Sequence, residues 1–431
     1  MPRGRKCMNL VEQSKKNKLP QLFFYLLTLF YSFIMFVLFY RQCVEYQGVY
    51  YSDMKAYILE AQGLESGYSF PYPLMFWTAR VFMLFFSPEV AMAVAVTILN
   101  SFTLILLKYY LDCFVKKSMA GQKKNWNGGW DVFVSLLALS LLFVSMLYAP
   151  RGHGFFGFDY IYRCSGSYTP NPYWNATYLA TRPFSIICFF SGVRLLESYE
   201  EQSSLKTMSL EVKKDYMVFA VSLFLTTITK PSYTLVAVVT FAAIMLYRFL
   251  RSKFGNFKQS VWFGLTFLPA GFALLYQYMG VFTGTNSLGE ETGIGIEIAK
   301  AWSIYSDNIP LSIFMAAAFP LGVLAINLPR LKDTTWFKHG WQIWLTGFVM
   351  FLFLYEKGFR LPHVNFSWGY MHGLFFVFTI SVLMLLQNSI VKKGKIRTAI
   401  VAAGWLGYVW HLGCGIVYFL YVYSGQNSGW F

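Results

Sequence analysis

Charged side chains are scarce in this sequence. Of its 431 residues, 13% are charged, whereas 56% are hydrophobic and 20% are aromatic. This balance excludes an ordinary soluble protein, and hydrophobic runs repeatedly approach the ~20 residues that cross a bilayer. The sequence therefore predicts an all-α polytopic membrane protein that forms one domain over residues 1–431, without a separate soluble domain.

Acidic residues are fewer than basic ones, 20 against 36, which gives a net charge of +16. A basic excess suits nucleic-acid binding, but membrane proteins also collect Lys and Arg in their cytoplasmic loops. Under the topology given below, 24 of the 36 basic residues fall in predicted cytoplasmic segments and eight in outer segments. The charge therefore indicates topology, and we expect no nucleic-acid partner.

Cysteine is rare as well, and the six cysteines are scattered without a CxxC motif or metal-ligand spacing. This pattern supports neither a structural zinc site nor a disulfide framework. Cys43 and Cys164 fall on one predicted side of the membrane, so a single disulfide between them stays open. The sequence also lacks a P-loop, HExxH and GxSxG, which argues against P-loop NTPases, zinc proteases and α/β-hydrolases.

Apolar runs are abundant, and we predict about eleven transmembrane helices with the N-terminus inside and the C-terminus outside. The run 71–87 is short and contains Pro71, Pro73 and Arg80. If it crossed the membrane, the lysines of 116–124 would lie outside, against the positive-inside rule, so we predict an interfacial helix there. The predicted spans are 21–40, 89–111, 131–149, 175–195, 215–229, 233–250, 260–280, 310–328, 341–355, 369–387 and 398–421.

The first predicted outer loop, 41–87, carries a carboxylate close to the membrane. Asp53 follows the first span and opens an amphipathic stretch predicted to be a helix over 53–63. A carboxylate at this position can act as a base where a lipid phosphate meets a water-soluble acceptor. Alternatively, Ser52 or Asp53 is simply the N-cap of that helix. The residues alone leave both interpretations open.

Outer segments also collect aromatic, amide and imidazole groups, mostly within 150–183. Aromatic rings stack on the apolar faces of sugars, and amides hydrogen-bond to hydroxyl groups. An interfacial aromatic belt with turn residues is the alternative. The candidate sugar- or acceptor-binding residues are His153, Asp159, Asn171, Tyr173, Trp174, Asn175, His363 and His372.

Basic residues near the outer side are candidates for binding a phosphate group. Arg182 lies inside a predicted span, where an unpaired guanidinium is unfavourable. Lys230 interrupts an apolar run, and Lys357 and Arg360 follow a later span. Such cations can clamp a phosphate and neutralise its departing charge, or they can anchor the chain at lipid headgroups.

The first outer loop resembles a known family. An acidic residue follows the first span, and the surface run opens with Pro71-x-Pro73-Leu74-x-x-Trp77. This pattern is similar to the GT-C superfamily of polytopic glycosyltransferases, which includes protein mannosyltransferases, oligosaccharyltransferases and bacterial aminoarabinose transferases. The resemblance covers residues 20–115 and implies that Asp53 is catalytic and that the Pro-Leu helix lies along the membrane surface.

The resemblance further implies an inverting glycosyltransferase in the cell membrane, with its active site on the extracytoplasmic side. The donor would be a polyprenyl-phosphate-linked sugar among membrane lipids, and the acceptor a glycan, lipid or protein. Several members carry an acidic pair where this chain has a lone Asp53, so metal use is open: no metal ligand is assigned, although Asp53, Asp159 and Glu290 would be candidates for a divalent cation. The alternatives are a transporter or flippase of lipid-linked glycans, and a polysaccharide polymerase or ligase. The Lys-, Phe- and Tyr-rich composition suggests a bacterial origin.

Overall fold

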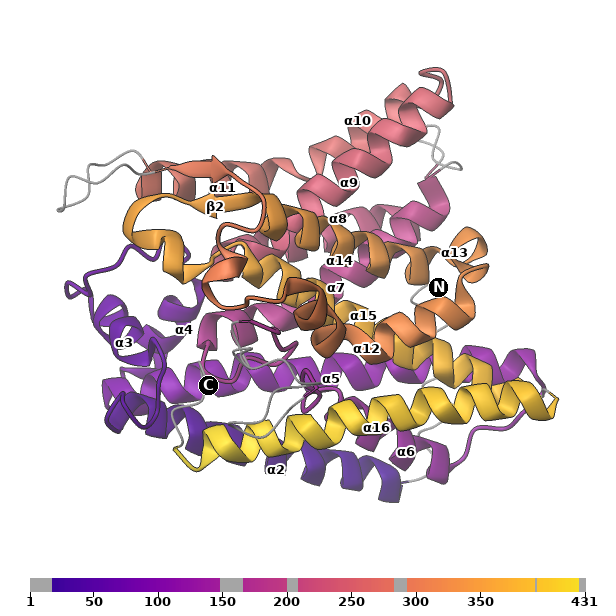
Figure 1. Ribbon diagram of the computed structural model, residues 1–431, viewed down its shortest axis with the longest axis horizontal. Helices are drawn as coiled ribbons and strands as arrows, with labels where there is room; N and C mark the ends of the chain where they lie inside the picture. The colour runs from indigo at the N-terminus through magenta and orange to yellow at the C-terminus, as the bar shows by residue number, and fades with distance from the viewer. Residues whose placement is uncertain (1–17, 148–165, 200–207, 283–292, 392–393, 426–431) are drawn as a thin grey trace.

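The computed structural model describes residues 18–147, 166–199, 208–282, 293–391 and 394–425. Long helices run roughly along one direction (Figure 1). A short antiparallel pair, β1 and β2, lies at one end of the bundle. The elements are α2 (Lys18–Val44), α3 (Met54–Gln62), α4 (Leu74–Phe82), α5 (Pro88–Gly121), α6 (Gly128–Ser140), α7 (Ala176–Ser198), α8 (Leu210–Thr229), α9 (Ser232–Arg251), α10 (Phe257–Leu265), α11 (Leu268–Phe282), β1 (Ile294–Ile296), η3 (Trp302–Ile304), α12 (Ile309–Asn327), α13 (Arg330–Asp333), α14 (Thr335–Phe353), β2 (Leu354–Glu356), η4 (Gly358–His363), α15 (Ser367–Ile390) and α16 (Lys395–Tyr423).

Seven helices of the described residues are long and apolar enough to cross a membrane. An eighth is added if α10 and α11, bent by 52° at their junction, count as one broken span. A mostly helical protein with membrane-spanning character is therefore confirmed. The eleven crossings and their orientation stay a prediction.

The predicted span 131–149 is wrong in its extent, because α6 ends at Ser140. The chain is irregular over the described residues that follow, and their backbone carbonyls bind side chains instead of continuing the helix. Asn171 donates its amide hydrogens to the carbonyls of Leu141 and Val144, and Tyr173 donates its hydroxyl to that of Leu142. These tertiary hydrogen bonds satisfy polar backbone groups that a helix would otherwise pair.

The run 71–87 forms the nine-residue helix α4. At a rise of about 1.5 Å per residue, a helix this short covers less than half of the ~30 Å hydrocarbon core. Its Arg80 donates hydrogen bonds to the carbonyls of Ala61 and Glu60, 2.7 Å and 3.2 Å away. Arg80 thus binds carbonyl groups at the C-terminal end of α3, which joins the two short helices of the first loop.

Helix α15 lies at the centre of the bundle, in contact with α5, α9, α12, α14 and α16. It is apolar around its whole circumference, as expected for a helix buried on all sides. Two glycines of α15 allow neighbouring helices to approach it closely. A Cβ atom on Gly373 would lie 2.7 Å from Cα of Trp344 in α14, and one on Gly369 would lie 2.5 Å from the Val236 side chain in α9.

A disulfide between Cys43 and Cys164 is not formed, since Cys43 is a free thiol buried at the end of α2. Cys164 itself lies outside the described residues.

Candidate functional site

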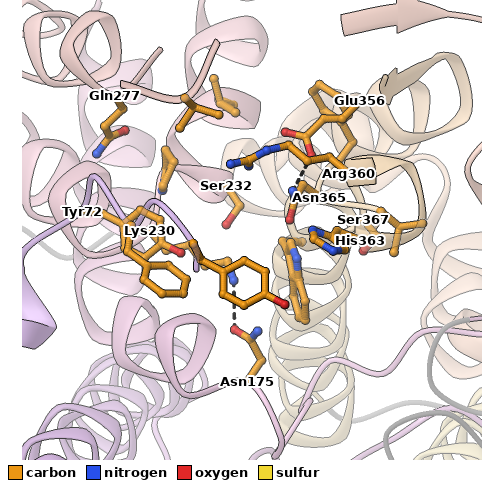
Figure 2. A pocket seen from close by; sticks show the side chains of 18 of the residues that line it. Tyr72, Asn175, Lys230, Ser232, Gln277, Glu356, Arg360, His363, Asn365 and Ser367 are labelled. Atoms are coloured by element: carbon orange, nitrogen blue, oxygen red, sulfur yellow. Dashed lines mark hydrogen bonds between the residues drawn. The ribbon is translucent and has the colours of Figure 1, made fainter. Parts of the chain in front are cut away.

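A cavity of about 490 Å³ lies at one end of the bundle. Its wall consists of the first loop after α2, the start of α7, the break between α8 and α9, α11, the β1–β2 pair and the start of α15. Figure 2 shows polar side chains from several of these elements around the same space, among them Lys230, Ser232, Arg360 and Asn365. The loops and helix ends of this region therefore form one shared site.

Asp53 lines this cavity and does not cap helix α3. It occupies the N-cap position, but its side chain accepts no capping hydrogen bond. Ser52 accepts a backbone hydrogen bond at the start of the helix instead, from the N–H of Met54 to its hydroxyl at 3.3 Å. The carboxylate of Asp53 is half-buried and accepts a hydrogen bond from the Tyr57 hydroxyl at 3.1 Å. Asp53 thus stands at the N-cap position, but capping does not explain why its side chain lines the cavity.

A chain of hydrogen bonds connects Asp53 with Lys230. The Tyr57 hydroxyl also lies 3.3 Å from the Thr177 hydroxyl. Lys230 donates from Nζ to Thr177 Oγ1 at 3.1 Å and to Asn175 Oδ1 at 2.9 Å. Residues from the first loop, the start of α7 and the α8–α9 break thereby share one polar network.

Lys230 is buried without a carboxylate partner within 4 Å among the described residues. Its Nζ atom lies 4.2 Å from the centroid of the Trp368 ring, a cation–π contact. Burial lowers the pKa of Lys230 to about 7, although the negative charge of Asp53 acts in the opposite direction. This lysine can therefore change its charge near neutral pH.

Arg360 lies across the same cavity beside the half-buried carboxyl group of Glu356. Asn365 donates a hydrogen bond to Glu356, and burial raises the pKa of Glu356, while Asn365 and the Arg360 charge lower it. The Arg360 guanidinium lies 5.5 Å from the Phe359 ring centroid, and within the described part of the chain it donates no hydrogen bond and forms no ion pair. Its donors are thus available to a ligand.

Two helices begin at the cavity wall, α9 at Ser232 and α15 at Ser367. Both hydroxyl groups are buried and find no hydrogen-bond partner in the described structure. The starts of the two helices touch, since a Cβ atom on Gly369 would lie 3.2 Å from the Ser232 carbonyl oxygen. Helix N-termini carry partial positive charge and free N–H groups, so with Lys230 and Arg360 this side of the cavity suits an anion.

The rest of the wall is largely apolar. Aliphatic side chains from α9, α11, α14 and the β1–β2 pair line it: Leu235, Leu274, Val281, Ile294, Met350 and Leu354. The cavity therefore combines an anion-binding side with an apolar side, which suits an amphipathic ligand.

Six of the residues selected from the sequence line the cavity: Asp53, Trp174, Asn175, Lys230, Arg360 and His363. Arg182, Asn171, Tyr173, His372 and Lys357 do not. His153, Asp159 and Glu290 lie outside the described residues.

Arg182 is fully buried between helices. It donates one hydrogen bond to Asn171 and another to Asn100 Oδ1 at 2.8 Å, and Asn100 donates to the Tyr31 hydroxyl at 2.7 Å. The guanidinium thus connects α7 with α5, α2 and the segment before α7. These hydrogen bonds give Arg182 a structural role in joining the helices. Asn171 and Tyr173 have a structural role too, because their hydrogen bonds hold the segment after α6.

The remaining two residues lie apart from the cavity as well. His372 is buried in α15, with its ring centroid 4.2 Å from that of Tyr178. The backbone N–H of Lys357 donates to the carbonyl of Gly293 beside the β1–β2 pair.

Sequence reasoning missed several residues that line the cavity or belong to its hydrogen-bond network. Tyr57 lies four positions after Asp53 and therefore on the same helix face, which was a usable signal. Thr177, Glu356 and Trp368 had no comparable signal, because their proximity depends on how the helices pack. Within the described part of the chain, no three His, Cys, Asp or Glu side chains are grouped so that they could hold a metal ion.

Comparison with known proteins gives no match. No family model matches the chain, and no curated protein or solved structure is significantly similar to it. Any statement about its activity therefore depends on the resemblance in the first loop and on the chemistry of this cavity.

Proposed function

We propose that this protein is an inverting glycosyltransferase of GT-C type that uses a polyprenyl-phosphate-linked sugar. One observation carries the proposal: the carboxylate of Asp53, free of any capping role, shares a cavity with Lys230 and Arg360. A base and two cations around one space match the needs of a transfer in which a hydroxyl loses its proton and a phosphate departs.

In this reaction Asp53 removes the proton from the acceptor hydroxyl as that oxygen attacks the anomeric carbon. The bond between the anomeric carbon and the phosphate oxygen breaks, and the electron pair leaves with the phosphate. Attack from the face opposite the leaving group inverts the anomeric configuration. Lys230, Arg360 and the N-termini of α9 and α15 stabilise the negative charge that develops on the phosphate.

The remaining wall fits the rest of the substrates. The apolar side chains of α9 and α11 would contact the isoprenoid chain, since hydrocarbon favours an apolar wall. Trp174 and Trp368, whose ring centroids lie 5.1 Å apart, offer aromatic surface to a sugar. A glycan, lipid or protein acceptor would approach Asp53 from the aqueous side.

The distribution of charge supports a cavity that faces outward. The cavity lies at the C-terminal ends of α8 and α14 and the N-terminal ends of α7, α9 and α15. Basic residues gather at opposite helix ends, such as Lys116 and Lys117 near the end of α5 and Lys395 and Arg397 at the start of α16. By the positive-inside rule those ends would face the cytoplasm, which supports the proposed orientation of the cavity.

The test is sugar transfer by purified protein from a panel of polyprenyl-phosphate sugars. We expect Asp53→Asn to abolish turnover while donor binding persists, because the amide cannot accept the proton. Glu60→Gln is the matched control: Glu60 lies on the same short helix but outside the cavity, so turnover should remain normal.

Full turnover by Asp53→Asn would contradict the role of Asp53 as the base. Donor binding without transfer by the wild type, across all donors and acceptors offered, would favour a flippase of lipid-linked glycans instead.

A further inference from the structure

We propose that Tyr57 and Thr177 form a proton relay that passes the proton taken up by Asp53 on to Lys230. The relay returns Asp53 to its ionised form and places a positive charge beside the departing phosphate. This inference rests on the proposed role of Asp53 as the base. It assigns a role to two hydroxyl groups for which the transfer reaction itself has no need.

Counting hydrogens shows which directions the relay can take in the resting site. An ionised Asp53 can only accept, so Tyr57 uses its one hydroxyl hydrogen for the 3.1 Å bond to that carboxylate. The Tyr57 oxygen can then only accept from Thr177 across 3.3 Å. Thr177 accepts in turn from Lys230 at 3.1 Å. Tyr57 and Lys230 therefore both donate toward the carboxylate. The single Thr177 hydrogen can turn to Tyr57 or to Asn175 Oδ1, which lies 3.0 Å away.

The hydrogen bonds between the same oxygen atoms can reverse their direction once Asp53 carries a proton. Asp53 then donates to Tyr57, Tyr57 donates to Thr177, and Thr177 turns to Asn175 Oδ1, which lies 3.0 Å away. Each hydroxyl has an acceptor in both directions, so neither state leaves a buried donor unpaired. A chain with two complete hydrogen-bonding patterns is the arrangement that a proton relay requires.

The transfer needs no partner beyond these four side chains. Asp53 gives its proton to the Tyr57 oxygen, Tyr57 gives its own to the Thr177 oxygen, and Thr177 gives its own to the lone pair of a neutral Lys230 amine. One proton has then moved from the carboxylic acid to the amine, leaving a carboxylate and an ammonium group. The lowered pKa of Lys230, about 7, means that a neutral amine is accessible near neutral pH.

Other charged groups around Lys230 affect the balance between its amine and ammonium forms. Arg360, His363 and Glu356 face the cavity with Asp53, and Arg182 and His372 lie in the packed helices behind it. Among these groups, Asp53 is the one whose charge favours the ammonium form of Lys230. This effect is coulombic and acts through space, so the pKa of Lys230 reports that the two groups share one site, and turnover reports the relay.

The experiment measures the pKa of Lys230 directly, by competitive acetylation with acetic anhydride across pH and mass spectrometry, with exposed Lys55 as the internal reference. In the wild type, Asp53→Asn should lower the pKa of Lys230 by about one unit, because a negative charge is lost. A similar shift is expected in a Tyr57→Phe background, because the two charges interact through space, and it would show that Lys230 keeps its place in that variant. No shift in the wild type would overturn the relay, because Asp53 and Lys230 would then be too far apart to exchange a proton.

Substitution of Thr177 interrupts the chain of hydrogen bonds at a second, independent position, in case Tyr57→Phe does not fold. Thr177→Val should slow turnover as Tyr57→Phe does, and Thr177→Ser, which keeps the hydroxyl, should retain the wild-type rate. Tyr50→Phe is the control for losing a hydroxyl group in the same loop, since the Tyr50 hydroxyl binds Arg41 and the Tyr423 carbonyl instead. A loss of turnover in Thr177→Ser or Tyr50→Phe as large as that in Thr177→Val would contradict the relay.

Turnover separates this inference from the proposed function. With an active donor and acceptor, Tyr57→Phe and Thr177→Val should lower kcat by about tenfold with the donor KM unchanged, and Thr177→Ser should restore it. Unchanged kcat in both variants would overturn the relay while leaving glycosyl transfer intact. Coupling between Asp53 and Lys230 without any sugar transfer would instead place the failure in the proposed function.

Discussion

The ammonium group of Lys230 contacts neutral oxygen atoms and an aromatic ring, although a carboxylate lies in the same cavity. Water is replaced by two hydrogen-bond acceptors and the face of Trp368, which compensate only part of the lost hydration. Its affinity for a proton is therefore low, and an anion brought into the cavity would restore the missing interaction.

We expect the affinity for a lipid phosphodiester to fall as the pH rises through about 7. Lysine is cationic below its pKa, and burial lowers the pKa of Lys230 from the usual 10.5 to about 7. The charge is thus lost between pH 6 and 8.5 instead of near pH 10. Losing one charge-assisted hydrogen bond should weaken binding about tenfold or more, which titration calorimetry at several pH values would measure.

Lys230→Arg is the control for this pH dependence, because a guanidinium stays charged throughout the range. Burial and the positive charge of Arg360 lower the pKa of His363, the imidazole that lines the cavity, so any dependence that His363 adds lies at lower pH than the loss of the Lys230 charge. If the wild type and Lys230→Arg lose affinity equally between pH 6 and 8.5, Lys230 does not bind the phosphate as a cation.

At the scale of elements, the cavity is built from places where helices stop. Helix α8 ends at Thr229 because Pro231 has no backbone N–H to continue it, and α9 restarts at Ser232. Helix α6 ends at Ser140, and the chain after it contacts Asn171 and α16. The packing of these irregular segments against neighbouring helices leaves little room for added atoms.

Gly415→Ala should destabilise the protein strongly. A Cβ atom on Gly415 of α16 would lie 1.7 Å from the carbonyl oxygen of Phe143, and backbone atoms cannot move aside as a flexible side chain can. Overpacking of this kind is unfavourable by about 3 kcal/mol. Thermal unfolding in detergent would measure the loss.

Gly413 in the same helix provides the comparison, since a Cβ atom there meets nothing within 4 Å. Gly413→Ala should leave the unfolding temperature unchanged or raise it slightly. Equal unfolding temperatures for the two variants would mean that α16 does not pack against the segment after α6 as described.

At the scale of the whole molecule, the proposal requires the cavity and the basic helix ends to lie on opposite sides of the membrane. Lys55 of α3 and Arg397 of α16 are both exposed and lie at these two ends. With the native cysteines replaced by serine, Lys55→Cys should react with a membrane-impermeant maleimide on intact cells. Arg397→Cys should react only after permeabilisation. The reverse pattern would place the cavity in the cytoplasm and contradict an extracytoplasmic transfer.

Composition and apolar run length were enough to predict a helical membrane protein. The short helix after Asp53 was predicted over 53–63 and spans Met54–Gln62, and a break at Lys230-Pro231 was predicted as well. Local preferences decide these features, because capping residues, proline and the amphipathic period act within a few residues of the chain. The end of α6 at Ser140 was missed because its cause lies in the distant side chains of Asn171 and Tyr173.

The sequence by itself determined the class of the protein, its helices and a short set of polar residues near their ends. Only the tertiary structure decided which of these residues meet: Asp53, Lys230 and Arg360 share a cavity, whereas Arg182 is held between helices. The physical reason is the geometry of the helix. Its side chains rotate by about 100° per residue, so the direction of each cation depends on which neighbouring helix buries which face, and that is set by packing across the whole bundle.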